Sequence, residues 1–416
     1  MPAPARELRV RMYRVGFGDC FLVTVGEGAE RGHALVDCGV HPTADIKTFD
    51  KVMDDIERTT DGRLGLLVAS HEHADHISGY GRYRDRFAAF RIGEVWMPWA
   101  LDPNDPDAVA LRTRRLELVR TLALHLEAVG GPPEIADVLL NLGFAPGSLG
   151  VSSNAVAVDA LRSGFGGAAR KVRYFQAGAR PEVPEELRGL TARVLGPPRD
   201  AAFLKRMDPP AGQRYLQLKG RRAEAVNALV PFLKKWELLP AEGRRRLRTR
   251  AADELDLAGE LEDSIHQLAL SLDTAANNTS LVLLLDFVGH TLLFPGDAQW
   301  GNWQSWLEAP GAESLLAGLS FFKVAHHGSH NATPRRALEG MPTGEFAAMV
   351  STQSKPWKSI PREPLMTRLT EKTRGRVVRS DSVKVAGAVA GPPLKARLPT
   401  GFKRGAQWLD YVYRLS

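Results

Sequence analysis

The chain has 416 residues, more than one domain usually contains, so we expect a core with a large insertion or a second small domain. Its 44% hydrophobic and 25% charged residues are typical of soluble globular proteins and exclude a disordered or fibrous chain. The formal net charge of +7 favours anionic partners in general. No stretch approaches the roughly 20 apolar residues that span a bilayer, and no secretion signal begins the chain, so we expect no membrane contact and a cytoplasmic location.

Short apolar and β-branched runs in the first part of the chain predict strands. A further segment, 45–58, carries apolar residues at helical spacing and predicts a helix. The expected strands cover 8–13, 20–25, 33–39, 64–69 and 91–97. This mixture of strands and helix predicts the α/β (α+β) class.

The character of the chain changes near residue 102. Helical patterns at 108–129 and in much of 221–270 dominate the middle, which contains only one expected core strand, near 190–196. The basic run 244–250 is typical of a solvated helix face, with a phosphate-contacting surface as the alternative.

Strand patterns return after this middle segment and complete the expected organisation. They cover 281–287, 291–294, 321–325 and 347–351, and a helix is expected at 362–373. We therefore divide the chain into a first core half (1–101), a mostly helical insertion (102–276), a second core half (277–385) and a C-terminal extension (386–416). The alternating aromatic residues near the end of the extension predict an added strand.

A histidine-rich motif follows the strand expected at 64–69. His71, His73, Asp75 and His76 form the pattern H-x-H-x-D-H, expected to lie in a loop. Imidazole nitrogens and carboxylate oxygens are ligands of Zn²⁺ and similar ions. His71 and His73 could therefore face one metal while Asp75 and His76 reach a second. The alternative is a surface loop that happens to be rich in histidine.

Two later strand ends carry further candidate ligands. Asp297 follows the strand expected at 291–294, where a carboxylate could bridge two metals, although a Gly-Asp pair alone is more often an ordinary turn. His326 and His327 follow the strand expected near 321–325. Such a pair is typical of one ligand plus one electrophile or acid, and the sequence does not tell which is which.

These segments together resemble the metallo-β-lactamase-fold hydrolases, most closely the hydrolase domain of ComEC/Rec2-type competence proteins. The resemblance covers roughly residues 8–100 and 277–382. Its motifs, in the order of that family, are residues 15–19, 36–39, 70–76, 277–283, 294–297 and 326–329.

The resemblance implies a four-layered αββα sandwich with a binuclear metal site at one edge. It implies that Asp37 orients the metal-binding loop by hydrogen bonding. Many relatives supply a further histidine before the strand that here begins near Ser280, whereas this chain has Asn277 and Asn278. Because an amide oxygen is a weaker ligand than imidazole, Asn278 would support Zn²⁺ less well, and Mn²⁺ is the alternative to Zn²⁺.

The expected reaction is hydrolysis by a metal-activated water. Asp75 and Asp297 would hold two divalent ions, and whichever of His326 and His327 is not a ligand would stabilise charge on the transferring group. Charge and resemblance favour a phosphodiester, in a nucleic acid or nucleotide, and Lys323 near the site adds to this. A lactone, lactam or other ester is the alternative substrate, and a non-catalytic, metal-containing module that binds a partner is the alternative function.

Overall fold

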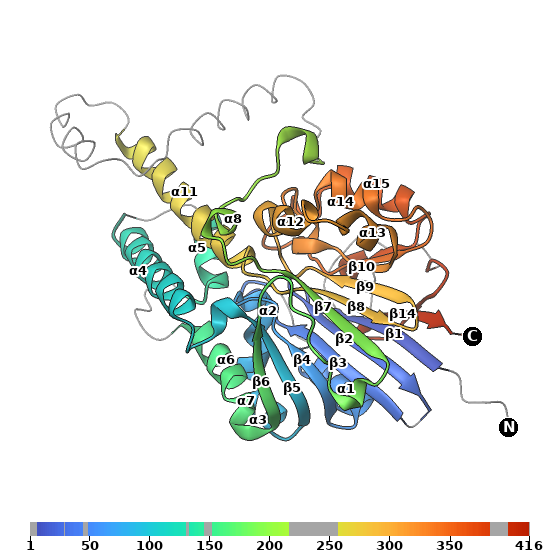
Figure 1. Ribbon diagram of the computed structural model, residues 1–416. Coiled ribbons are helices and arrows are strands. Elements are labelled where there is room, and N and C mark those ends of the chain that lie inside the picture. The colour runs from blue at the N-terminus through green and yellow to red at the C-terminus, as the bar shows by residue number, and fades with distance from the viewer. Residues whose placement is uncertain are drawn as a thin grey trace.

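A computed structural model describes residues 6–28, 30–44, 49–129, 133–144, 152–215, 257–382 and 398–415. This part of the chain forms two mixed β-sheets with helices around them (Figure 1). None of its helices combines the length and apolarity needed to cross a membrane. The basic run 244–250 and most of the helices expected within 221–270 lie outside the described residues.

The first sheet has eight strands in the order β13-β14-β1-β2-β3-β4-β5-β6. β1, β2 and β3 pair antiparallel, and β3 to β6 pair parallel. The bounds are β1 Arg6–Tyr13, β2 Cys20–Glu27, β3 Glu30–Cys38, β4 Arg63–Val68, β5 Arg91–Pro98, β6 Ala169–Phe175, β13 Phe402–Arg404 and β14 Trp408–Arg414. β14 pairs antiparallel with β1, which confirms the added strand that the aromatic C-terminal residues predict.

The second sheet has six strands in the order β12-β11-β10-β9-β8-β7. Its parallel part runs from β9 to β12, and β7, β8 and β9 pair antiparallel. The bounds are β7 Leu190–Gly196, β8 Val282–Phe287, β9 His290–Phe294, β10 Leu319–Lys323, β11 Ala347–Val350 and β12 Val377–Arg379.

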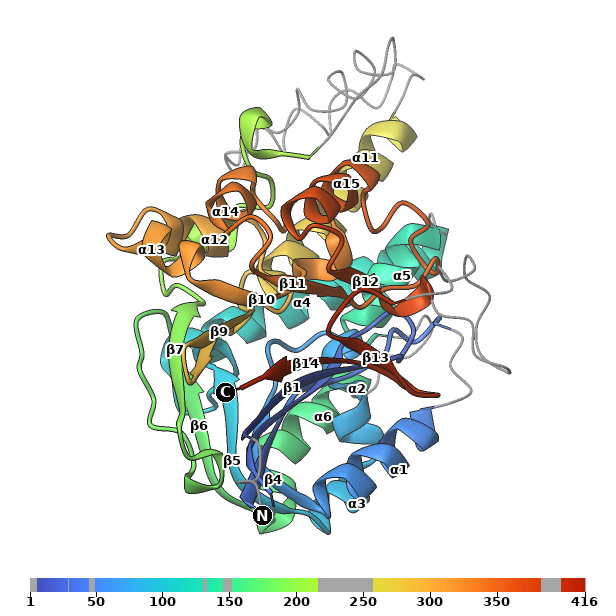
Figure 2. The same ribbon diagram turned by 90° about the vertical axis from the view of Figure 1, so that its right-hand side faces the viewer.

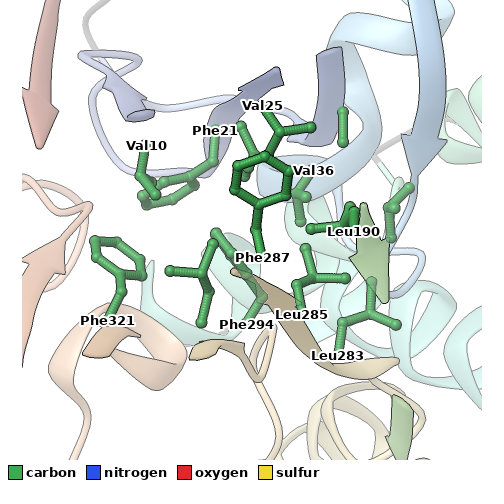
Figure 3. Close-up of a cluster of buried hydrophobic side chains, with 14 of the residues drawn as sticks. Val10, Phe21, Val25, Val36, Leu190, Leu283, Leu285, Phe287, Phe294 and Phe321 are labelled. Carbon is green, nitrogen blue, oxygen red and sulfur yellow. The ribbon is translucent and has the colours of Figure 1, made fainter. Parts of the chain in front are cut away.

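The main hydrophobic cluster lies between the two sheets (Figure 3). Val10, Phe21 and Val36 contribute from the first sheet, and Phe294 and Phe321 from the second. The rings of Phe21 and Phe294 meet at a centroid distance of 5.9 Å. Successive side chains of a strand point to opposite faces of its sheet, so each strand turns one face into this cluster and the other face outward.

Helices cover the outward faces of both sheets (Figure 2). A second cluster packs the first sheet against α1 (Phe49–Thr60), α2 (Ala74–Arg82), α3 (Arg84–Ala88), α6 (Ser153–Arg162) and α7 (Gly164–Gly167). A third packs the second sheet against α12 (Trp300–Leu307), α13 (Ala312–Ala317), α14 (Arg335–Gly340) and α15 (Glu363–Lys372). A separate apolar cluster joins α4 (Pro106–Val129), α5 (Pro133–Asn141) and α11 (Leu257–Asn277).

Two elements differ from the sequence-based prediction. β6 lies in the segment predicted to hold a single strand, and its charged residues Arg170, Lys171 and Arg173 hide the strand pattern because an edge strand need not be apolar. The middle segment thus contributes one strand to each sheet. The loop predicted for 70–76 is wrong for its second half, since α2 begins at Ala74 and includes Asp75 and His76.

Candidate metal centre

The H-x-H-x-D-H motif joins the end of β4 to the start of α2. The turn 70–73 carries His71 and His73, and the first turn of α2 carries Asp75 and His76. A carboxylate suits this position because the partial positive charge of a helix lies at its N-terminus. All four side chains are buried, with exposed fractions of at most 1%. The backbone N–H of Asp75 donates to the Asn141 side chain of α5 at 3.1 Å, which ties α2 to that helix.

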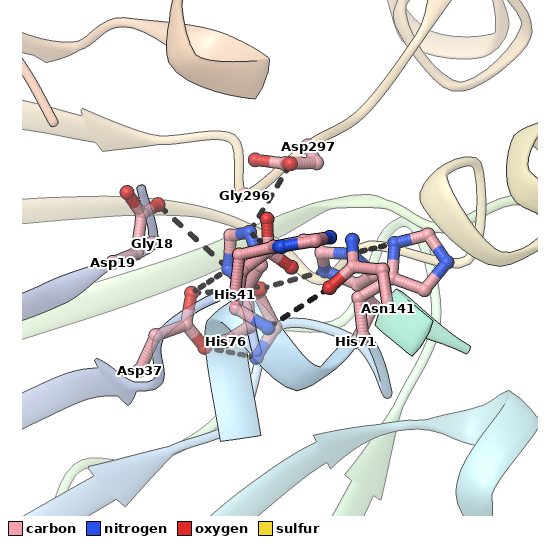
Figure 4. Close-up of polar contacts among 12 residues, drawn as sticks. Gly18, Asp19, Asp37, His41, His71, His76, Asn141, Gly296 and Asp297 are labelled. Atoms are coloured by element: carbon pink, nitrogen blue, oxygen red, sulfur yellow. Dashed lines mark hydrogen bonds and ion pairs between the residues drawn. The ribbon is translucent and has the colours of Figure 1, made fainter. Parts of the chain in front are cut away.

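The structure brings the predicted ligands into two adjoining groups. One group is His71, His73 and Asp75, and the other is Asp75, His76, Asp297 and His327; within each, the potential ligand atoms lie within 4.8 Å of one another. Asp75 belongs to both groups. Asp297 follows β9 and His327 follows β10, both in the second sheet, whereas His76 follows β4 of the first sheet, so the two sheets each supply part of the centre. Figure 4 shows His76 and Asp297 side by side.

Hydrogen bonds fix which nitrogen of His76 and His71 carries the proton. Asp37 accepts from the backbone N–H and the hydroxyl of Ser70, at 2.7 and 2.8 Å, and from His76 Nδ1 at 2.8 Å. His76 Nε2 is therefore left with a free lone pair. Because the Ser70 hydroxyl donates to Asp37, it can only accept from His71 Nδ1, 3.1 Å away. The lone pair of His71 is then also at Nε2.

His327 is oriented in the same way by a different acceptor. Its Nδ1 lies 2.8 Å from the carbonyl oxygen of Ser351, which can only accept, so the lone pair is on Nε2. That nitrogen lies 3.1 Å from Asp75 Oδ2 and 3.3 Å from Asp297 Oδ2. His76 Nε2 similarly lies 3.1 Å from Asp297 Oδ2.

Imidazole lone pairs that face carboxylate oxygens at these distances repel each other unless a cation lies between them. In the protein alone that cation is a proton. Burial lowers the pKa of His327, but Asp297 and Asp75 outweigh this effect and raise it to about 10. The pKa of His76 is raised well above its usual value, since Asp297, Asp75 and Asp37 together outweigh its burial. A divalent ion would satisfy the same lone pairs and carboxylates.

Unpartnered atoms provide an independent test of this fit. Among the described residues, the buried atoms Asp75 Oδ1, His76 Nε2 and His73 Nε2 have no hydrogen-bond partner. Buried polar atoms rarely remain unpaired, and those that do often mark an ion or a functional site. The donor set of imidazole and carboxylate groups suits Zn²⁺ and also Mn²⁺. The residues could therefore hold divalent metal ions.

A buried ion pair supports the carboxylates. Lys323, at the end of β10, contacts the Asp19 carboxylate, and its Nζ lies 2.9 Å from the Gly296 carbonyl oxygen and 3.3 Å from Asp297 Oδ1. Burial alone would lower the pKa of Lys323, but Asp19 and Asp297 raise it. The Lys323 charge is thus paired with the carboxylates of Asp19 and Asp297 inside the protein. It therefore no longer supports the expectation of an anionic substrate.

The structure separates the roles of His326 and His327, which the sequence left open. Both have left-handed backbone conformations, with φ of 46° and 53°, which non-glycine residues adopt at some cost. This turn places the side chain of His327 in the second ligand group, with Asp75, His76 and Asp297. His326 stays at the edge, with 16% of its side chain exposed, its Nε2 3.8 Å from Asp297 Oδ2 and its Nδ1 unpartnered.

The expected metal-supporting role of Asn278 is corrected by its contacts. Its Oδ1 accepts from the backbone N–H groups of Gln299 and Asn302, at 3.1 and 3.2 Å. Its Nδ2 donates to backbone carbonyls of residues 203, 204 and 206. Both lone pairs and the donor protons are therefore used to join α12 to the end of α8 (Ala201–Leu204) and the residues that follow it, which leaves no amide atom for a metal.

Several supporting residues were not predicted from the sequence. They are Asp19 and Lys323 as an ion pair, Asn141 on α5, Ser351 after β11, and Asp273 on α11. Each acts through a residue far away in the chain, and no local pattern marks such a partner. Asp19 had a signal, because it closes the motif at 15–19, and Lys323 was noted near the site but for its charge towards a substrate.

No protein-family model matches this chain, and no curated protein sequence matches it significantly. The assignment of the site therefore depends on its own geometry.

Proposed function

We propose that this protein is a hydrolase that uses two divalent metal ions and a metal-activated water, acting on a phosphodiester. The observation that carries the proposal is the pair of adjoining ligand groups that share Asp75, with the free lone pairs of His71, His76 and His327 all directed into them. A structural zinc site is closed by four ligands. Six residues make up the two groups, fewer than two closed four-ligand sites would need, so coordination positions would remain for a water and a substrate.

The fold supports the same proposal. Helices lie on the outer faces of two facing sheets, as expected for the αββα sandwich of the metallo-β-lactamase-like hydrolases. The ligands lie at strand ends on one side of both sheets, after β4, β9 and β10. Asp37 contacts Ser70 and His76 in the way proposed for an orienting aspartate.

The charges of the centre also favour divalent ions. Four buried carboxylates, those of Asp19, Asp37, Asp75 and Asp297, face one buried ammonium, that of Lys323. Uncompensated buried charge is costly; protons on His76 and His327 offset part of it in the protein alone, and divalent ions would offset it when bound. When bound, two divalent ions would polarise the scissile group and lower the pKa of a bridging water.

The residues of the chain have distinct roles in this proposal. His71 and His73 would hold one ion, His76, Asp297 and His327 would hold the other, and Asp75 is shared by the two groups. His326 is the imidazole that a substrate can approach. Burial lowers its pKa to about 4 despite Asp297, so at neutral pH it is uncharged. A neutral imidazole still has one N–H, which His326 would donate to the transferring group.

The substrate class has more limited support. The net charge of +7 favours a polyanion, and the resemblance to the hydrolase domain of competence proteins favours nucleic acid or a nucleotide.

The test combines metal analysis with a small substrate panel. Purified full-length protein is analysed for metal content, then assayed with an aryl phosphodiester, a β-lactam and a lactone, with Zn²⁺ and Mn²⁺ added separately. We expect about two ions per chain and turnover of the phosphodiester. Turnover of the lactam or lactone alone would refute the substrate class.

Substitution of the ligands tests the site itself. The double variant His73→Ala and Asp297→Ala should lose both metal and turnover, whereas Asp286→Asn, on β8 and bonded to Thr291, should keep both. A double variant that is metal-free and fully active would refute the proposal.

A further inference from the structure

His73 differs from His71, His76 and His327 in the hydrogen bonds that its ring makes. His71, His76 and His327 each have one ring nitrogen fixed by a hydroxyl, carboxylate or carbonyl oxygen. His73 has no such partner within hydrogen-bond distance: its Nδ1 lies 3.1 Å from His71 Nε2, and its Nε2 is buried without a hydrogen bond. The residue is 1% exposed, so bulk solvent does not reach the ring.

The contact between His71 and His73 has two interpretations. Because His71 Nε2 carries a lone pair, His73 Nδ1 could donate a proton to it. His73 would then offer its lone pair at Nε2, away from the ligand group. Alternatively, both facing nitrogens carry lone pairs that converge on one ion, and the proton of His73 is on Nε2. Some group must select between these tautomers.

The carboxylate of Asp273 on α11 is the group placed to do so. Asp273 Oδ1 lies 3.7 Å from His73 Nε2. Its other oxygen, Oδ2, accepts from Asn277 Nδ2 at 2.8 Å. The two residues are one helical turn apart, so they share one face of α11, and the amide of Asn277 holds the carboxylate in place. Oδ1 is thereby left for His73.

We propose that Asp273 is a positioning residue that accepts a hydrogen bond from His73 Nε2 and so makes Nδ1 the metal-binding atom. The inference rests on the proposed function. Shortening the Asp273–His73 distance by less than 1 Å reaches hydrogen-bond length, and a metal that draws Nδ1 inward would orient the ring. The two nitrogens lie on opposite sides of the ring, so Asp273 stands outside the ligand group of His71, His73 and Asp75.

The arrangement has a chemical consequence. A carboxylate behind a ligating imidazole fixes the tautomer and increases the basicity of the ligand, and removing it typically weakens metal binding by about 10- to 100-fold. The group proposed to hold the first ion has no further histidine from the segment before β8, where the chain has Asn277 and Asn278. Asp273 would strengthen the binding of the first ion through His73 instead of adding a ligand.

The direct test reads the His73 tautomer in the wild-type protein. Full-length protein labelled with ¹⁵N-histidine is examined by NMR before and after addition of Zn²⁺, with resonances assigned by single histidine variants. We expect His73 to be protonated at Nε2 in the sample with Zn²⁺, and Zn²⁺ to shift Nδ1; without the metal, burial with Asp75 and Asp297 raises the pKa of Asp273 to about 8, so the tautomer is fixed only above that pH. A ring protonated at Nδ1 in protein that binds Zn²⁺, or Zn²⁺ bound at Nε2, would overturn the assignment. Failure to bind Zn²⁺ at all would instead refute the proposed function.

A variant provides the second test. Asp273→Asn should weaken Zn²⁺ binding about 10- to 100-fold in competition with a chromophoric chelator, and mix the two tautomers of His73. Asn277→Ala should have a smaller effect in the same direction, and Asp286→Asn should have none. Circular dichroism in the presence of a chelator checks that all variants are folded. Folded Asp273→Asn with wild-type affinity and an unchanged His73 tautomer would overturn the inference.

Discussion

Lys323 provides a quantitative test of the buried charges around the candidate metal centre. Its ammonium contacts Asp19 and lies 3.3 Å from Asp297, and the Lys323 and Asp19 side chains are 2% and 1% exposed. Lys323→Met keeps the approximate volume and removes only the charge and its donors. Asp19 would then be a buried carboxylate whose nearest cationic groups among the described residues are the imidazoles of His76 and His327, each 3.7 Å away. Removing one partner of such a pair costs about 3–5 kcal/mol.

The assay is urea unfolding followed by tryptophan fluorescence, with a chelator present so that metal binding does not contribute. We expect the free energy of unfolding to fall by about 3–5 kcal/mol in Lys323→Met. The deficit should shrink as the pH falls, because protonation of Asp19 removes the unpaired charge.

The double variant Lys323→Met and Asp19→Asn tests the cause of the loss. Without the Asp19 charge there is little left to compensate, so the double variant should be more stable than Lys323→Met by about 2 kcal/mol or more. A loss below about 1 kcal/mol in the single variant, or a double variant that is no more stable, would show that the pair does not carry the stability assigned to it.

Two further predictions concern single residues. Asp37 has a φ of 57°, which asparagine tolerates, so Asp37→Asn should fold normally but bind Zn²⁺ about 10- to 100-fold more weakly in chelator competition, because His76 loses its carboxylate partner. Unchanged affinity would count against the orienting role. His33 is 7% exposed, and burial, with Arg9 and Arg31, lowers its pKa to about 4. The unfolded chain therefore binds a proton that the folded protein does not, and stability falls as the pH drops from about 6.5 to about 4. His33→Gln should remove up to about 3 kcal/mol of this pH dependence in urea unfolding, and identical slopes in the two proteins would contradict the reasoning.

Much of the fold could be predicted because local composition reflects burial. Strands such as β4 and β8, buried in the cores, are continuous apolar runs and were located to within a residue or two. β6 was missed because it is an edge strand with charged residues. The start of α2 was missed because glycines at 79 and 81 and the histidines before it obscure the helical pattern.

The candidate metal centre shows a similar division. The types of ligand were visible in the sequence, since imidazole and carboxylate groups at several strand ends are an unusual combination. Which atoms meet depends on backbone conformation and on partners far away in the chain. The left-handed turn at His326 and His327 decided which imidazole enters the cluster, and the contacts of Asn278 removed it from the candidate ligands.

The sequence by itself determined the class of fold, most strands and the identity of the residues that form the two ligand groups. It could do so because hydrophobic periodicity and ligand chemistry are properties of neighbouring residues. Only the tertiary structure decided that Asp75 belongs to both groups and that Lys323 forms an ion pair with Asp19. It also placed Asp273 next to Nε2 of His73. These facts depend on side chains from different elements meeting at one edge of two sheets, and such meetings leave no trace in any single stretch of sequence.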